Sequence, residues 1–246
     1  MNRILSLIIC VFLITSCGNK REGEQKTGLL SNFIDITDNE DAGVKEILDF
    51  YGGQCKYAIG ASASTKEGNK KYFELEMSQS DAIEKLADKM EMPASNIAYL
   101  FYRNLKDEKE NYDEIHSVII FEDGTKKTFE YSTKQLGLVH NRMKTVNKVV
   151  ELISSNDFQT LKSILNNELV GFDKDEIITN LENMNPKLGK VIEFNPYGFR
   201  INKSKSGIEI LHISGAMIRE LQNNAFSIDL DLNSEKEEIY LLQYKL

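Results

Sequence analysis

The residues best suited to acid–base chemistry fall between positions 197 and 231 of the 246-residue chain. His212 lies in an alternating apolar run, and an imidazole beside a carboxylate is a common general acid or base. Tyr197, Arg200 and His212 are therefore candidate pocket residues, with Asp229 and Asp231 as nearby carboxylates. The alternative is that His212 faces solvent or hydrogen-bonds within its sheet, and that both aspartates lie on the solvent face.

Metal, cofactor and nucleophile chemistry lacks a sequence signature. The chain has three Cys and three His, which leaves little material for a multi-ligand zinc site or a disulfide framework. Asp229 and Asp231 would stand about 7 Å apart on one side of a strand, but no further oxygen ligands can be assigned to a metal there. His116 and His140 are distant in sequence from these residues and are expected to be exposed. We therefore expect no metal, no cofactor and no catalytic residue.

Composition narrows the class of protein further. Apolar residues make up 41% and charged residues 28% of the chain, as in ordinary globular proteins. The net charge is −8 at pH 7, which argues against nucleic acid as a partner because phosphate binding needs an electropositive face. The length allows one large or two small domains.

The first residues predict a secretion signal. Arg3 precedes an apolar run, Ile4–Ile14, whose helix would cover about 16 Å, roughly half of a bilayer's ~30 Å hydrocarbon core. The run therefore reads as a signal-peptide core rather than a membrane span. The alternative is a buried or amphipathic N-terminal helix.

The end of this run, Ile14-Thr15-Ser16-Cys17, resembles the lipobox of bacterial lipoproteins. The resemblance implies a signal peptide over residues 1–16, cleavage between Ser16 and Cys17, and lipid on the Cys17 sulfur and amine. Several acyl chains anchor a protein far more firmly than one. The alternative is that Cys17 is an ordinary free thiol.

Cleavage would leave a mature chain with a net charge of −9, so acyl chains rather than surface charge would hold it to anionic lipid. Gly18 follows Cys17, so the aspartate that retains enteric lipoproteins at the inner membrane is absent and the outer membrane is favoured. Residues 17–40 read as the lipidated N-terminus and a polar tether. Cys55 would then be the remaining thiol without acylation, expected to be buried and inert in a strand.

Two α+β units are predicted after the tether, each an antiparallel sheet with helices. In the first, residues 41–133, a helix near position 44, two strands and a second helix are followed by strands from residue 97 onward. Met92-Pro93 is expected to close the second helix. Residues 106–114 read as a solvated charged loop, and Asp123-Gly124 predicts a hairpin.

In the second unit, residues 134–246, apolar residues spaced by three and four predict a long helix. Two shorter helices, capped by Asp157 and Asp173, are predicted to follow. Strands come next, the first two over residues 190–194 and 198–202. The segment 149–161 is similar to the opening of the NTF2-like (cystatin-like) superfamily, and Leu188-Gly189-Lys190-Val191 resembles the step into its sheet. The resemblance implies a cone in which a curved sheet wraps a long helix, with a pocket at the wide end. It implies no single activity.

Three functions remain at this stage. The favoured one is a non-catalytic cell-envelope lipoprotein that holds membrane lipid through its anchor and binds a protein or envelope ligand. A structural or assembly factor of the envelope would instead expose a sizeable apolar patch. An NTF2-like enzyme acting on a small substrate would need His212 and an acidic partner in one enclosed pocket.

Overall fold

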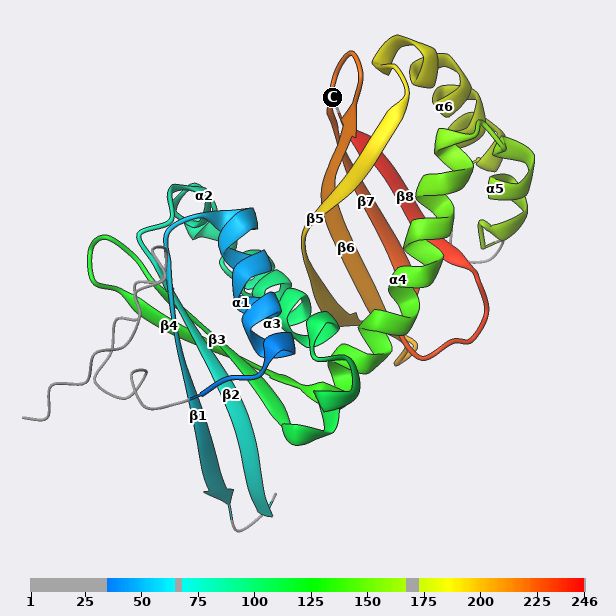
Figure 1. Cartoon of the computed structure of the whole chain (residues 1–246). Helices are drawn as coiled ribbons and strands as arrows, with labels where there is room; N and C mark the ends of the chain where they lie inside the picture. Colours follow the sequence, from blue (N-terminus) through cyan, green and yellow to red (C-terminus); the bar gives the residue numbers. More distant parts are fainter. Residues whose placement is uncertain (1–34, 65–67, 167–172, 246) are drawn as a thin grey trace, which may run out of the picture.

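The computed structural model describes residues 35–64, 68–166 and 173–245 (Figure 1). The predicted signal peptide, its cleavage point, the lipid attachment at Cys17 and most of the predicted tether lie outside the described residues. The described chain forms two four-stranded sheets with helices packed on them, which confirms the α+β class. No helix in these ranges combines the length and apolar character of a membrane span.

The first sheet has the strand order β1-β2-β3-β4. Its β2–β3 pair is parallel, whereas the two outer pairs are antiparallel. The prediction of a purely antiparallel sheet is wrong here, because a long crossover returns the chain in its original direction. The elements are α1 (Asp38–Tyr51), β1 (Gln54–Ser64), β2 (Gly68–Ser78), α2 (Asp81–Glu84), η2 (Ala87–Lys89), α3 (Glu91–Asn104), η3 (Lys106–Asn111), β3 (Glu114–Ile120) and β4 (Lys126–Ser132).

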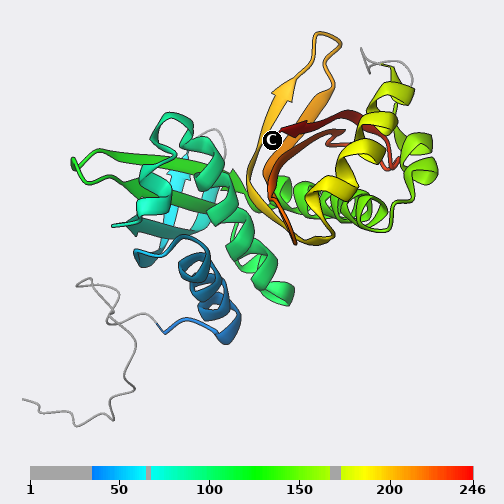
Figure 2. The same cartoon turned by 90° about the horizontal axis from the view of Figure 1, so that it is seen from above.

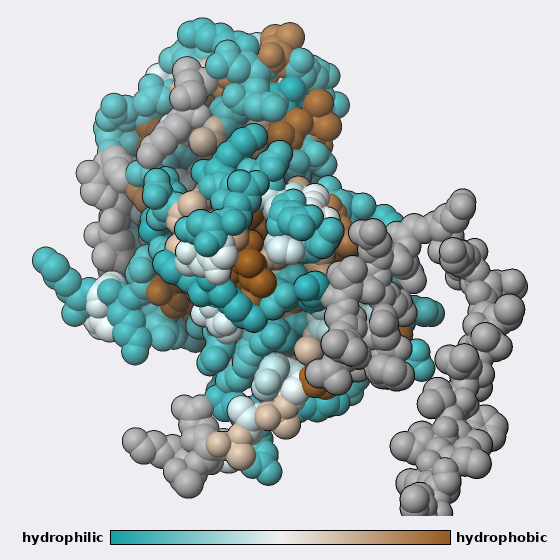
Figure 3. All heavy atoms as spheres, turned by 90° about the vertical axis from the view of Figure 1, so that its left-hand side faces the viewer, coloured by the Kyte–Doolittle hydropathy of each residue, from teal (hydrophilic) through white to brown (hydrophobic). Residues whose placement is uncertain are grey.

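One face of the first sheet is buried and the other is polar. Helices α1 and α3 cover the buried face, while Figure 1 shows no described helix over the opposite one. Strand β2 explains the division, since Phe73, Leu75 and Met77 are fully buried. Alternate side chains of a strand point to opposite faces, so the alternate residues of β2, Tyr72 and Glu74 among them, belong to the polar face. The described surface on the left-hand side of Figure 1 is mostly hydrophilic (Figure 3).

The prediction of a strand at residues 97–104 is wrong, because these residues belong to helix α3. Residues 92–102 of this helix are buried in every position, and a continuous apolar run does not distinguish a buried strand from a buried helix. Pro93 lies in the first turn of α3 and does not close a preceding helix. A first-turn proline fits because its missing N–H would have no partner within the helix.

The second sheet is an antiparallel meander of order β5-β6-β7-β8. The predicted strands around residues 190–194 and 198–202 are one strand, β5, whose register shifts twice. Asp157 and Asp173 cap the two shorter helices through their side chains, as acidic N-caps do. The elements are α4 (Thr133–Ser154), α5 (Phe158–Ile164), α6 (Lys174–Leu188), β5 (Val191–Lys203), β6 (Glu209–Arg219), β7 (Asn224–Asp231) and β8 (Ile239–Lys245).

Helix α3 also joins the two sheets. Figure 2 shows it between the first sheet and β5, with α4, α5 and α6 on the other side of the second sheet. The Ser95 hydroxyl accepts a hydrogen bond from the Phe199 backbone N–H at 2.8 Å and donates to the Met92 carbonyl at 2.9 Å. At Gly198, which has a φ of +149°, a Cβ atom would lie 1.9 Å from the Met92 carbonyl oxygen. This close approach requires glycine.

Candidate functional site

The three candidate pocket residues named from the sequence line one cavity. Tyr197, Arg200 and His212 border a space of about 470 Å³ between the second sheet and the segment that leads into α3. A volume of this size is within the range of small-molecule sites. The other polar side chains lining it are Asp88, Lys89, Glu91, Ser214, Ser227 and Gln243.

This cavity lies on the face of the second sheet that points away from α4, α5 and α6. On β6, Met217 and Arg219 are buried, and the Arg219 guanidinium donates to the Asn185 side chain of α6 at 2.7 Å. His212 has the opposite parity on the same strand and therefore faces the other way. The residues of η2 and α3 that border the cavity, Lys89 and Glu91 among them, belong to the first part of the chain.

A row of polar side chains crosses the second sheet, and two of its members, Arg200 and His212, line the cavity. Arg200, His212 and Asp229 are register partners on β5, β6 and β7. The His212 Nδ1 atom lies 2.6 Å from an Asp229 carboxylate oxygen, and the two side chains are 16% and 21% exposed. A hydrogen bond from the imidazole to a carboxylate fixes the ring's orientation and leaves Nε2 for a ligand. Asp231, in contrast, accepts a hydrogen bond from the Asn233 backbone in the following turn.

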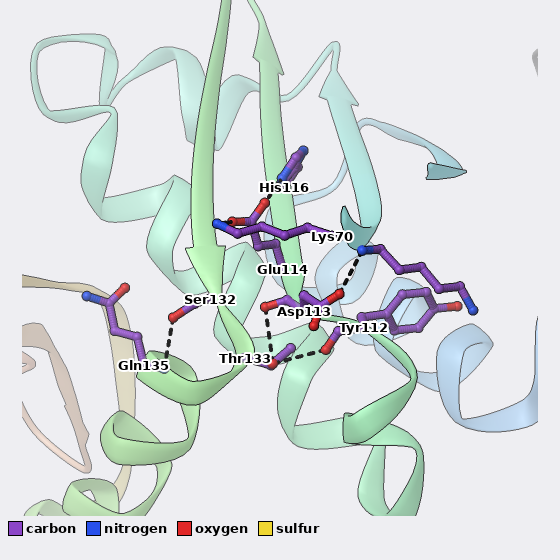
Figure 4. Close-up of polar contacts among 9 residues, drawn as sticks. Lys70, Tyr112, Asp113, Glu114, His116, Ser132, Thr133 and Gln135 are labelled. Carbon is purple, nitrogen blue, oxygen red and sulfur yellow. Dashed lines mark hydrogen bonds and ion pairs between the residues drawn. The ribbon is translucent and has the colours of Figure 1, made fainter. Parts of the chain in front are cut away.

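Sequence reasoning missed a second histidine–carboxylate pair, on the polar face of the first sheet (Figure 4). The expectation that His116 is exposed is wrong, since the residue is 7% exposed. Its Nε2 atom lies 3.0 Å from one Glu114 oxygen, and the Lys70 ammonium lies 2.6 Å from the other. The signal was present as Glu114-Ile115-His116, because residues two apart share one face of a strand.

The environment of Glu114 keeps its carboxylate ionised. Burial alone would raise the pKa of Glu114, but hydrogen bonds from Lys70 and His116 outweigh burial and hold the pKa below the ordinary glutamate value. The assignment of residues 106–114 to a solvated loop is therefore wrong at its end. Glu114 begins a central strand and is 9% exposed, because β3 has neighbouring strands on both sides.

The other two chemically notable residues are less suited to reactions. His140 is half-buried rather than exposed, its Nδ1 atom lies 3.4 Å from the Tyr99 hydroxyl, and burial lowers its pKa. Cys55 is on β1 as expected and is half-buried. Burial, aided by the charge of Glu76, raises the pKa of its thiol to about 12. A thiol with this pKa stays protonated and is a poor nucleophile.

Comparison with known proteins adds no assignment to this geometry. No protein-family model, no curated protein and no solved structure matches the chain. Proposals about function therefore rest on the predicted N-terminal signal and on the two histidine–carboxylate pairs, His116–Glu114 and His212–Asp229.

Proposed function

We propose that this chain is a lipid-anchored protein of the cell envelope, in the outer membrane rather than the inner one. We also propose that its cavity binds a small polar ligand. The anchor is supported by the apolar leader that ends at Ile14-Thr15-Ser16-Cys17. The single observation that carries ligand binding is the meeting of Tyr197, Arg200 and His212 in one cavity.

The lining favours a ligand rich in hydroxyl groups, such as a saccharide. Arg200 and Lys89 offer hydrogen-bond donors, Asp88 and Glu91 offer acceptors, and Gln243 offers both. Each sugar hydroxyl both donates and accepts, so a mixed lining suits it better than a lining of one charge. Tyr197, which is 40% exposed, adds an aromatic surface at the same site.

The second sheet with α4, α5 and α6 is further proposed to be an NTF2-like unit. The order of three helices followed by four antiparallel strands supports this proposal. The family resemblance implies a pocket inside the cone that surrounds the long helix. The cavity proposed for the ligand is on the opposite face of the sheet, so its use would belong to this chain rather than to the family.

Each of two alternative functions, an enzyme and a structural or assembly factor, is supported by one observation. The 2.6 Å contact between His212 and Asp229 favours an enzyme that uses the imidazole as an acid or base. The exposed apolar side chains of Ile192 and Leu221, 64% and 72% exposed, favour a structural or assembly factor with a protein partner.

Metabolic labelling with an alkyne analogue of palmitate tests the anchor. We expect label on the parent chain, none on Cys17→Ala, and full label on Cys10→Ala, which removes a thiol within the leader. Label that persists on Cys17→Ala would contradict lipid attachment at this residue.

A glycan array probed with the purified full chain tests the cavity. We expect retention of a restricted set of saccharides, weakened roughly tenfold or more in Arg200→Ala and unchanged in Lys205→Ala. Lys205 is an exposed cation outside the cavity, so the control loses the same charge. Equal retention by both variants would contradict binding at this cavity. Turnover of a retained saccharide that is lost in His212→Gln would favour the enzyme.

A further inference from the structure

Three side chains with metal-binding chemistry meet on the polar face of the first sheet. Glu114 and His116 project from β3, and Glu130 is the register partner of His116 on β4. One ligand atom from each residue lies within 4.8 Å of those of the other two. Neither strand has to move as a whole to bring these atoms around one ion.

The imidazole of His116 is already oriented by its surroundings. Its ring stacks on the Tyr72 ring, with centroids 4.1 Å apart and planes 12° from parallel. Tyr72 lies across Gly60 on the neighbouring strand, where a Cβ atom would come 2.3 Å from the tyrosine Cζ atom. Packing that fixes a ligand before the ion arrives strengthens metal binding.

The charges of the cluster also suit a dication. Lys70 pairs with Glu114, but among the described residues no hydrogen bond or ion pair engages the exposed Glu130 carboxylate. Two carboxylate ligands balance a charge of +2, and an imidazole that coordinates a metal adds no charge. Nitrogen together with carboxylate oxygen is a donor set typical of Zn²⁺, whereas Mg²⁺ and Ca²⁺ prefer oxygen alone.

We propose that Glu114, His116 and Glu130 form a zinc-binding site, and that the Lys70 ammonium is the cation that zinc displaces from Glu114. Three protein ligands leave a fourth position for water or for a group of a bound molecule. The site is on a different sheet from the ligand cavity and does not depend on the function proposed for that cavity.

Titration of the purified, chelator-treated full chain with zinc chloride in a calorimeter tests the site. We expect one zinc ion per chain, and an affinity reduced roughly tenfold or more in Glu130→Gln. Glu130 is exposed, so this variant should fold as the parent does. Glu110→Gln removes the same charge from an exposed position in η3 and should bind zinc like the parent.

Lys70→Met gives a change of opposite sign, which a merely destabilised protein would not produce. Removal of the competing ammonium should tighten zinc binding severalfold. The proposal is overturned if the parent binds no zinc at millimolar concentration, if Glu130→Gln binds as tightly as the parent, or if Lys70→Met binds more weakly.

Discussion

Each sheet carries a buried or half-buried histidine paired with a carboxylate, yet the two pairs have different surroundings. His116 and Glu114 lie on one strand, on a face that no described helix covers (Figure 1). His212 and Asp229 lie on neighbouring strands, where the sheet faces residues from η2 and α3 across a cavity. A histidine–carboxylate pair is common to both regions, so the other side chains around each pair decide what the region can bind.

Those additional groups differ in kind. Around His116 they are a lysine that neutralises Glu114 and a second carboxylate within reach of the same point. Around His212 they are an arginine in the same cross-strand row and a mixed polar lining. The first arrangement gathers three possible ligand atoms around one point, which suits an ion. The second spreads donors and acceptors over a volume, which suits a molecule.

Gly198→Ala should have the largest effect, and it should impair the cavity but not the Glu114 cluster. The new Cβ atom would lie 1.9 Å from the Met92 carbonyl oxygen and 2.7 Å from the Ser95 hydroxyl, so β5 must move away from α3. We expect a loss of about 3 kcal/mol in the free energy of unfolding, measured with urea. At low temperature, ligand retention by the cavity should be lost while zinc binding persists, because Glu114, His116 and Glu130 lie on the polar face of the first sheet, opposite the face that α3 covers.

Gly207→Ala is the control for this substitution. Gly207 has a φ of +86° but nothing within 4 Å of its added Cβ atom, so the variant should lose only about 1 kcal/mol through backbone strain. If both variants lose the same free energy, the close approach of β5 to α3 is not what Gly198 provides.

Ser95→Ala tests the same contact through a hydrogen bond. Ser95 is fully buried and its oxygen accepts from the Phe199 N–H. Removal of the hydroxyl leaves that donor buried without a partner, which costs about 1–3 kcal/mol. Chemical denaturation should show this loss, together with weaker ligand retention. An unchanged midpoint would mean that another group satisfies the Phe199 N–H.

Lys70→Met tests the ion pair between Lys70 and Glu114 on the first sheet. The folded-state pKa of Glu114 is lowered, so its interactions stabilise the fold fully above the ordinary glutamate pKa. This stability is lost as the pH falls through the lowered value. The variant should therefore be less stable than the parent at pH 7, by at most about 1 kcal/mol, and the difference should shrink under acid conditions. Urea unfolding at neutral and acid pH measures both values, and a difference that grows with acid would contradict the role of Lys70.

The sequence predicted the parts of this molecule that depend on local pattern. The hairpin at Asp123-Gly124 is present, with the Asp123 side chain accepting from the Thr125 N–H at 2.7 Å. The caps at Asp157 and Asp173 are also present. Turn and cap preferences arise within a few residues, so they can be inferred without the tertiary structure.

The parts that were missed depend on pairing between distant segments. The apolar run from Ile97 is typical of a strand, and it is helical here because it is buried between the two sheets. The parallel pairing of β2 and β3 was missed for the same reason, since α3 is part of the crossover that connects them. Tyr197, Arg200 and His212 could be named together because they are close in the sequence. The face of the sheet that carries them could not, since the NTF2-like resemblance implies a pocket inside the cone, on the side of the long helix. The Glu130 partner of His116 could not, because their contact requires the register of β3 against β4.

Ser117→Ala should have the smallest effect, and it tests whether a change on the buried face of β3 affects the polar face. Ser117 lies between His116 and Val118 but points toward the helices, where it is fully buried and its hydroxyl has no hydrogen-bond partner among the described residues. Because a buried hydroxyl without a partner is costly, its removal should leave the stability unchanged or raise it by about 1 kcal/mol.

Ser95→Ala is the matched control, since it removes the same atom from an equally buried serine that has partners. Urea unfolding of both variants should give opposite or clearly unequal changes, with zinc affinity unaffected by Ser117→Ala. A destabilisation equal to that of Ser95→Ala would mean that the Ser117 hydroxyl has a partner, and a change in zinc affinity would mean that the two faces of β3 are coupled.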